Sequence, residues 1–563
     1  MVAFTAWPFF YFFVGWLFLI YIYYIYKNNV IYFKKSTIQI SGFVLYSIYK
    51  LTKGELTLEK IAVVLVETYR ASLVIADSDT DNYFNIVCEE NENIKLGLDL
   101  NRDHFLKKPQ IDDTIRVLKN YKKLCDMHDV QKTIAVCNFN YDNKPKNLYS
   151  FFDEVFASCG FRFNLLSGEE QNNAIYSSII NTYDLPKALA VNIGSDNVNF
   201  IHYNRRNILN QVQFTFGPVT LLDMFGGEDY TPDVLYSKIR KYVETQLSDL
   251  AFIGELEEEF GVVGAGRFYT DIAKMVRKYK KYPIEKDDNL EVTLDDLDYL
   301  EKQLLELNLD STKKIKGIEE PRGDVFTVAV IIANAIARAV KREKLIVASR
   351  SLLMGVLLRE VIPSILEKPI SDVLGFSVVS ESTHYDPLNT KHNEQVYNLA
   401  MLLFKQLRVL HKLPRGYVKV LRVASYMHDA GKRINYKNHA KLAYPVILNS
   451  DIYGISHREL ILASFVASLH QGGEVPMSEW IKYKDILLDE DIDAVKKLGS
   501  ILRLAEAFDH TKTNAIVDIS CDILGDSVIM KTITQGDNSY ELEKAQEGAK
   551  EFERYFKKKI EIL

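Results

Sequence analysis

The stretch LVIADSDTDNYFNIV (residues 73–87) reads as an apolar strand, an acidic turn and a second strand, and LAVNIGSDNVNFIHY (residues 189–203) repeats that form later in the chain. Apolar and polar residues alternate at the end of both stretches, which is typical of strands with one buried face. The second stretch continues into ILNQVQFTF (residues 208–216), a third alternating strand. A duplicated hairpin of this kind predicts two related α/β domains that face each other across a site.

The composition limits the class of protein. A chain of 563 residues is long enough for three or four domains. The net charge of −6 is mild, so we expect no nucleic acid partner. The cysteines are scattered without a CxxC pair, which favours a reducing compartment and argues against a thiolate metal site. They are Cys88, Cys125, Cys137, Cys159 and Cys521.

The N-terminus differs from the rest of the chain. Residues 1–26 carry no charge, and residues 9–25 (FFYFFVGWLFLIYIYYI) approach the ~20 apolar residues that span a bilayer. Lys27, Lys34 and Lys35 follow this segment, which places the remainder in the cytoplasm by the positive-inside rule. We therefore predict a transmembrane helix that anchors cytoplasmic domains to the membrane. The alternative is a translated upstream extension, in which case the protein is soluble and cytoplasmic.

From residue 366 onward the pattern is helical, and eight of the eleven histidines lie after position 383. Several helices place a histidine or aspartate on the apolar stripe, three or four residues from the nearest apolar neighbours. Burying one such group unpaired costs about 2–7 kcal/mol, and a shared divalent metal would compensate several together. The alternative is a set of ordinary core or capping histidines. The residues are His392, His428, Asp429, His439, His470 and Asp509.

The residues YMHDAGK (426–432) resemble the signature of HD-domain phosphohydrolases, whose ligand order is His, His-Asp and a distant Asp. The resemblance implies that His392, His428, Asp429 and Asp509 hold the metal. His439 and His470 fall where such families place further metal- or phosphate-binding histidines. A second His-Asp dipeptide, His128–Asp129, has no such companions, and we expect it at the surface.

Further landmarks follow one another in a familiar order: FGPVTLLDMF (216–225), VVGAGRFYTDIAKM (262–275), EEPRGDVFTVAVII (319–332), SRSLLMGVLLREV (349–361) and ILRLAEAFDH (501–510). From about residue 71 to its end, the chain resembles the Ppx/GppA family of exopolyphosphatases and guanosine pentaphosphate phosphohydrolases. The resemblance implies two actin-like (ribonuclease H-like) α/β domains and an all-α HD-like domain. It further implies a divalent metal, most often Mg or Mn, a polyphosphate or guanosine polyphosphate substrate, and a homodimer as one assembly.

The expected boundaries are 1–68 for the transmembrane anchor and linker, 69–174 for the first actin-like domain, 175–365 for the second, and 366–563 for the HD-like domain. The first family loop, Asp-Ile-Gly-Ser-Asn-Ser, matches residues 77–82 (DSDTDN), where Asp77 is kept. The second, Asp-Ile-Gly-Gly-Gly-Ser-Thr-Glu, matches residues 192–199 (NIGSDNVN), where both acids are asparagine. Phosphate binding in that loop is implied for Gly194, Ser195 and Asn197.

The stretch LLSGEEQNNAIY (165–176) matches the family's Ser-Gly-Glu-Glu-Glu-Ala, whose last acid is the general base, and Gln171 stands there. An amide does not take a proton from water near neutral pH, and loss of a base costs ~10²–10⁴-fold in rate. Glu170 is one residue away, although Glu169 and Glu170 are equally typical of a helix N-terminus. Three hypotheses remain open: hydrolysis in the α/β cleft by Asp77 and Glu170, hydrolysis at a metal in the HD-like domain, and a sensor that binds polyphosphate or an alarmone without cleaving it.

Overall fold

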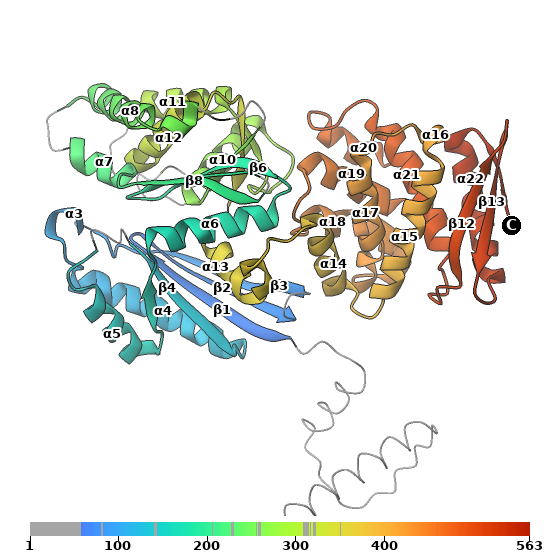
Figure 1. Cartoon of the computed structure of the whole chain (residues 1–563), viewed down its shortest axis with the longest axis horizontal. Coiled ribbons are helices and arrows are strands. Elements are labelled where there is room, and N and C mark those ends of the chain that lie inside the picture. Colours follow the sequence, from blue (N-terminus) through green and yellow to red (C-terminus); the bar gives the residue numbers. More distant parts are fainter. Residues whose placement is uncertain are drawn as a thin grey trace, which may run out of the picture. The chain divides into compact units, whose positions relative to one another are not determined.

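The computed structural model describes residues 58–563 apart from 80–82, 99, 140–143, 205, 227–229, 255, 257–259, 308–314, 316, 319–322 and 350 (Figure 1). The predicted membrane span at residues 9–25 lies outside the described residues. Within the part of the chain that is described, no helix is both long and apolar enough to cross a membrane.

A five-stranded sheet forms the first α/β domain, in the order β3-β2-β1-β4-β5. β1 lies at its centre, antiparallel to β2 and parallel to β4. The run of apolar residues in β1 is buried on both faces, as expected for a central strand covered on both sides. The elements are β1 (Glu59–Glu67), β2 (Arg70–Asp79), β3 (Tyr83–Asn93), α3 (Leu100–Asp103), α4 (Lys108–Met127), β4 (Lys132–Asn138), α5 (Leu148–Cys159) and β5 (Phe163–Leu165).

A six-stranded sheet forms the second α/β domain, in the order β10-β11-β9-β6-β7-β8. β6 is antiparallel to β7 and parallel to β9, which repeats the directions around β1. The strands are β6 (Lys187–Ile193), β7 (Val198–Asn204), β8 (Asn207–Phe214), β9 (Gly261–Ala265), β10 (Glu291–Thr293) and β11 (Lys344–Ala348). The helices are α7 (Pro218–Phe225), α8 (Pro232–Ser248), α9 (Ala251–Gly254), α10 (Arg267–Lys280), α11 (Leu294–Glu306) and α12 (Gly323–Ala339).

The two sheets confirm the predicted duplication. The hairpins that correspond in the two domains, however, differ by one strand from those that the sequence predicts. The equivalent of the β6–β7 hairpin is β1–β2, because β1 and β6 each pair antiparallel with the next strand along the chain and parallel with the strand on their other side. Residues 73–87 instead span the hairpin of β2 and β3, whose counterpart is β7–β8. The expected boundary at residue 69 also separated β1 from its own domain, whereas the compact unit begins at Leu58.

Two helices join the α/β domains through a shared core. α6 (Gly168–Thr182) follows the first sheet, and α13 (Ser351–Val361) ends the second domain. Ile175 of α6 and Leu357 of α13 belong to one buried cluster with Val63 of β1 and Ala190 of β6. Packing between both sheets therefore fixes the N-terminus of α6, which carries the Glu170–Gln171 sequence.

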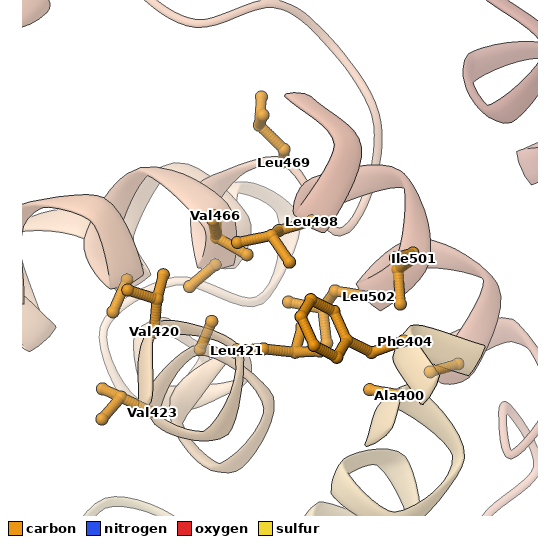
Figure 2. Packing of buried hydrophobic residues seen from close by; sticks show 14 of the residues in the cluster. Ala400, Phe404, Val420, Leu421, Val423, Val466, Leu469, Leu498, Ile501 and Leu502 are labelled. Atoms are coloured by element: carbon orange, nitrogen blue, oxygen red, sulfur yellow. The ribbon is translucent and has the colours of Figure 1, made fainter. Parts of the chain in front are cut away.

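The C-terminal region is mostly helical. Apolar side chains of α15, α17, α19 and α21 interlock in its core, including Phe404, Leu421, Val466 and Leu502 (Figure 2). The elements are η1 (Pro363–Leu366), α14 (Val373–Tyr385), α15 (Thr390–Gln406), α16 (Arg408–His411), α17 (Tyr417–Met427), η2 (Ala430–Arg433), η3 (Tyr436–Asn438), α18 (His439–Asn449), α19 (His457–Ser468), α20 (Met477–Trp480), η4 (Ile481–Tyr483), α21 (Asp491–Ala507) and α22 (Ser539–Phe556).

The prediction that this region is all-α is wrong at its end. β12 (Ile516–Ile523), β13 (Ser527–Thr534) and β14 (Lys559–Ile562) form a three-stranded sheet. α22 connects β13 to its parallel neighbour β14, which is a strand–helix–strand crossover. Gln406 of α15 fixes β12, since its amide donates to the backbone oxygen of Ile519 and accepts a hydrogen bond from the backbone N–H of Cys521.

Candidate functional site

One cleft is lined by the turns at the carboxyl ends of strands from both sheets. Residues 67–70 follow β1, residues 194–197 connect β6 to β7, residues 266–268 open α10, and Ser349 follows β11. Ligands of open α/β sheets bind at such strand ends. The cleft is therefore the first candidate site.

The residues with an implied phosphate role, Gly194, Ser195 and Asn197, all lie in this cleft. The backbone N–H of Gly194 donates to the oxygen of Asn197 at 2.9 Å, which closes the turn. The start of α7 packs tightly on it, since a Cβ at Gly217 would lie 2.6 Å from the oxygen of Ser195. The three residues are thus held together, and phosphate binding by them stays a prediction.

Asp77 lies elsewhere, because the matching turn is the one after β1. Asp77 pairs with Lys60 at the start of β1, whereas the cleft is at Glu67. Seven residues of strand separate the two ends, which is roughly 23 Å. Glu67 is therefore the acid at the topological position of the first family loop, and Asp77 is far from the phosphate turn.

Glu67 and Asp196 are carboxylates that line the cleft at its two turns. The Asn138 amide donates to Glu67 Oε1 at 3.0 Å. Burial raises the pKa of Asp196 to about 6, and the negative charge of Glu67 adds to the effect. Both groups lie near the turns that would receive a phosphate.

Glu170 caps α6. Its carboxylate accepts from the backbone N–H of Ser167 at 2.8 Å, and Ser167 Oγ accepts from the N–H of Glu170 at 3.2 Å. The hydrogen bonds from Ser167, backbone first, lower the pKa of Glu170. This capping box is the structural role that the sequence left open for the acid pair.

Amides stand in place of family acids on α6 and β7. Gln171 is 2% exposed; its Nε2 donates to the oxygen of Leu166 at 3.2 Å, and its Oε1 accepts from Gln213 at 3.0 Å. Asn199 donates to Asn172 Oδ1 at 2.6 Å. Together with Asn192, these amides leave no carboxylate at positions 171, 192 and 199, where the resemblance implies acids.

The second candidate site is a buried cluster in the helical region. His392 belongs to α15, His428 and Asp429 follow α17, His439 begins α18, and His470 follows α19. Two groups of three residues each bring one ligand atom per residue within 4.8 Å of the others, namely His392, His428 and Asp429, and Asp429, His439 and His470. Asp429 belongs to both triads, so the predicted residues converge on one carboxylate.

Backbone and carboxylate oxygens orient all four imidazoles. The Nδ1 atoms of His428, His439 and His470 lie 2.6–2.7 Å from the backbone oxygens of Ser425, Tyr436 and Ala467. A carbonyl oxygen only accepts, so Nδ1 carries the proton and Nε2 keeps its lone pair. Partners of this kind commonly fix metal-bound histidines.

The Nε2 lone pairs point at one another. His439 Nε2 and His470 Nε2 are 3.0 Å apart, a repulsive contact between acceptors unless a cation or an added proton lies between them. His392 Nε2, His428 Nε2 and Asp429 Oδ1 are buried without a hydrogen-bond partner among the described residues. A divalent ion in each triad would satisfy these atoms, so the cluster fits a metal.

The protonation states also fit. Burial lowers the pKa of His428 to about 3 and also lowers that of His470, so both rings are neutral at pH 7. Burial favours the neutral form of Asp429, but the surrounding imidazoles and Lys432 outweigh it and hold its pKa well below the usual value. Neutral imidazole and ionised carboxylate are the forms that bind metal.

Asp509 stands behind the cluster. Its Oδ2 accepts from His392 Nδ1 at 2.8 Å, and its Oδ1 accepts from the backbone N–H of Asn514 at 2.8 Å. Both oxygens are thus engaged, and the residue positions His392. The implied direct coordination by Asp509 is not among the two triads found in the described residues.

Sequence reasoning proposed Lys432 as a phosphate-neutralising residue but missed three others around the cluster, Lys512, Gln471 and Glu506. Lys432 donates to Asp429, and Lys512 Nζ lies 3.9 Å from Asp429 Oδ2. Gln471 Nε2 lies 3.2 Å from His439 Nε2. Burial raises the pKa of Glu506, but hydrogen bonding to His510 and the nearby imidazoles bring it to about 2. The i,i+4 pair Glu506 and His510 in ILRLAEAFDH was the available sequence signal.

Comparison with known proteins agrees with this arrangement of domains. Residues 74–362 match the Ppx/GppA phosphatase family, and residues 377–548 match domain III of Ppx/GppA phosphatases. The first match alone covers about half of the chain, so the chain belongs to the Ppx/GppA phosphatase family. An exopolyphosphatase from Cytophaga hutchinsonii has the same fold with 22% identity, a TM-score of 0.50, and coverage of 54% of this chain and 98% of its own.

Two curated relatives carry phosphatase names. A bifunctional 3-dehydroquinate synthase/phosphatase of Fusobacterium nucleatum is 24% identical over 314 residues, which are 53% of this chain and 46% of that protein. A guanosine-5'-triphosphate,3'-diphosphate pyrophosphatase of Aeromonas salmonicida is 22% identical over 322 residues, covering 56% and 62%. The chain thus spans about half to three fifths of the length of these relatives.

Proposed function

We propose that this member of the Ppx/GppA phosphatase family is a metal-dependent phosphohydrolase whose hydrolytic centre is the HD-like histidine–aspartate cluster of the helical region. The observation that supports it best is the contact of 3.0 Å between His439 Nε2 and His470 Nε2, two acceptors that face each other next to the ionised Asp429.

The side chains of the cluster would have two roles, metal binding and phosphate binding. A divalent ion supplies an acidified water and a positive charge for a phosphate when it is bound. Asp429 and the two imidazoles of either triad would hold such an ion, and these nitrogen donors favour Mn, Fe or Zn over Mg, which prefers oxygen. Lys432 and Lys512, beside Asp429, would neutralise the phosphate oxygens of the substrate. Burial of the cluster excludes bulk water and strengthens these interactions.

The substrate class follows from the family. Relatives are named for guanosine pentaphosphate and for polyphosphate, so we propose a phosphoanhydride of one of these kinds as the substrate. The test is phosphate release from both compounds by the full chain, stripped of metal and then supplied with Mn²⁺ or Mg²⁺. His428→Ala should abolish release, while His128→Ala, in the isolated His-Asp dipeptide, should leave it unchanged. Activity that survives His428→Ala would refute the assignment.

A second candidate is hydrolysis in the α/β cleft. Asp196 favours it, since a pKa of about 6 gives this cleft carboxylate the proton affinity that a general base needs. The absent acids at positions 171 and 199 count against it. Loss of phosphate release in Asp196→Asn but not in His428→Ala would select this candidate over the metal centre.

The proposed membrane anchor at residues 9–25 is independent of both sites. Fractionation of cells that express the full chain tests it, and recovery of all the protein in the soluble fraction would exclude an anchor.

A further inference from the structure

A short segment of the second α/β domain contacts the helical region. The linking segment, residues 282–290, connects α10 to β10. Tyr282 Oη lies 2.9 Å from His457 Nδ1, and the Asn289 amide donates to the oxygen of Ile455. Lys286 Nζ donates to the oxygen of Ser450 at 2.5 Å. The linking segment is therefore hydrogen-bonded to the helical region at the first residue of α19 and in the loop before it.

Asp288 connects the contact between the linking segment and the helical region to the cleft. Its Oδ1 accepts from the backbone N–H of Ser349 at 2.7 Å and from Ser349 Oγ at 2.9 Å, and Ser349 lines the cleft. The backbone oxygen of Asp288 accepts from His457 Nε2 at 2.9 Å. One residue thus touches a cleft residue with its side chain and the first residue of α19 with its backbone.

α19 leads from this contact to the proposed metal centre. It runs from His457 to Ser468, and His470, a member of the second triad, stands two residues beyond its end. A helix of 12 residues is a stiff rod of about 18 Å, so a shift at its start is transmitted to its far end. His457 is buried and makes two hydrogen bonds to the linking segment, which fix its ring on both sides.

A phosphate in the cleft would compete with Asp288. Ser349 gives both of its donors to this carboxylate, and it lines the same cleft as the turn of residues 194–197. A phosphate oxygen that accepts from Ser349 must displace Asp288 Oδ1, because two anions that share the same donors repel each other. Asp288 Oδ1 also accepts from the Tyr183 hydroxyl at 2.8 Å, so a ligand that takes over Ser349 would leave Asp288 bonded to Tyr183 without Ser349, and occupancy of the cleft would select between these two arrangements.

We propose that the α/β cleft is a regulatory binding site for a phosphate-bearing anion, and that its occupancy alters the helical metal centre through Asp288, His457 and α19. The amides at positions 171, 192 and 199, where the family motifs have acids, suit this role, since an amide does not act as a general base. The effect on catalysis rests on the proposed function, whereas the coupling itself does not.

Hydrogen exchange in the full chain tests the coupling without metal. Tripolyphosphate is the probe, and a chelator keeps the metal centre empty so that the probe cannot act there. Protection of residues 194–197 reports binding in the cleft. We expect the exchange rates of the linking segment and of the first turn of α19 to change about five-fold or more, the lower end of known couplings.

His457→Phe removes both ring hydrogen bonds at nearly constant volume. In this variant, tripolyphosphate should still protect residues 194–197 from hydrogen exchange, but the exchange rates at the start of α19 should no longer change. His411→Phe is the matched control, a buried histidine that bonds to the oxygen of Phe404 and lies outside the linking segment; its α19 should respond as in the wild type. Binding in the cleft with no change in wild-type α19 overturns the proposal, and so does an absence of binding. A separate Mn²⁺ titration decides the metal centre, so the two failures are distinguishable.

Discussion

His439 and His470 face each other with Nε2 atoms 3.0 Å apart, while each ring donates its Nδ1 proton to a carbonyl oxygen of its own segment. The two carbonyls fix both tautomers, so neither ring can relieve the contact by moving its proton. Two buried acceptors at this distance are stable only when a positive charge, a metal ion or an added proton, lies between them. The cluster is therefore suited to a cation, and we expect its properties to depend on one.

The first prediction concerns metal-dependent stability. Mn²⁺ at 100 times its dissociation constant should stabilise the native state by about 2.7 kcal/mol and raise Tm, because the unfolded chain lacks the site. His470→Ala should lose most of this rise, as it removes one of the two facing nitrogens. His411→Ala, a buried histidine outside the triads, should lower Tm yet keep the rise. Thermal unfolding with and without Mn²⁺ measures both, and equal rises in wild type and His470→Ala would count against the site.

The second prediction concerns stoichiometry. Two triads that share Asp429 provide for two ions in each chain. His392→Ala disrupts only the first triad, so the metal content should fall from two ions to one. Asp429→Asn weakens both triads, so the content should approach zero. Elemental analysis of the gel-filtered protein gives these numbers, and one ion in the wild type would limit the centre to a single site.

The sequence predicted the members of this cluster because helical spacing is a local property. His392, His428, His439 and His470 lie three or four residues from buried apolar neighbours, and all four are buried. The hydrogen bond between His392 and Asp509 depends on how two distant helices pack, so spacing alone could not separate a ligand from its supporting residue. The contact of Asp288 with His457 is equally a product of tertiary packing.

The errors in the fold have local causes. Neither residues 67–70 (ETYR) nor residues 77–82 (DSDTDN) keep the glycine of the family loop, but only the second run begins with its Asp, so the sequence favours β2–β3 as the first hairpin. Apolar and polar residues do alternate in β12 (IVDISCDI) and β13 (SVIMKTIT). Both strands follow a long helical region, however, so the sequence favours a helical assignment for the whole region. The alternation of apolar and polar residues identifies the strands here. Their position in a sheet follows only from the hydrogen-bonded pairing of the strands.

The third prediction concerns Gln171→Glu. The change removes the donor to the oxygen of Leu166 and places a buried carboxylate against it, which should cost about 1–3 kcal/mol of stability. It should not create activity in the cleft, because Asp77 lies at the far end of β2 and Glu170 is held by Ser167. Denaturant unfolding and phosphate release provide the two measurements. Glu169→Gln, an exposed change in the same helical turn, is the control; new hydrolysis in Gln171→Glu that survives His428→Ala would show that the cleft needs only its base.

The last prediction concerns the pH dependence of the contact between β3 and α14. Burial raises the pKa of Glu381 from 4.5 to about 7, Asp451 raises it further, and Lys286 and Ser450 oppose the shift. The native state then binds the proton more tightly than the unfolded chain, so the contribution of Glu381 to stability is present below pH 4.5 and is lost as the pH rises to about 7. Glu381→Gln keeps a neutral side chain at every pH and should flatten the decline of the unfolding free energy across this window. Urea unfolding at a series of pH values compares it with wild type and with the exposed Glu367→Gln, which should retain the wild-type slope. Equal slopes in wild type and Glu381→Gln would mean that the carboxyl is ionised in the native state and that the interface tolerates its charge.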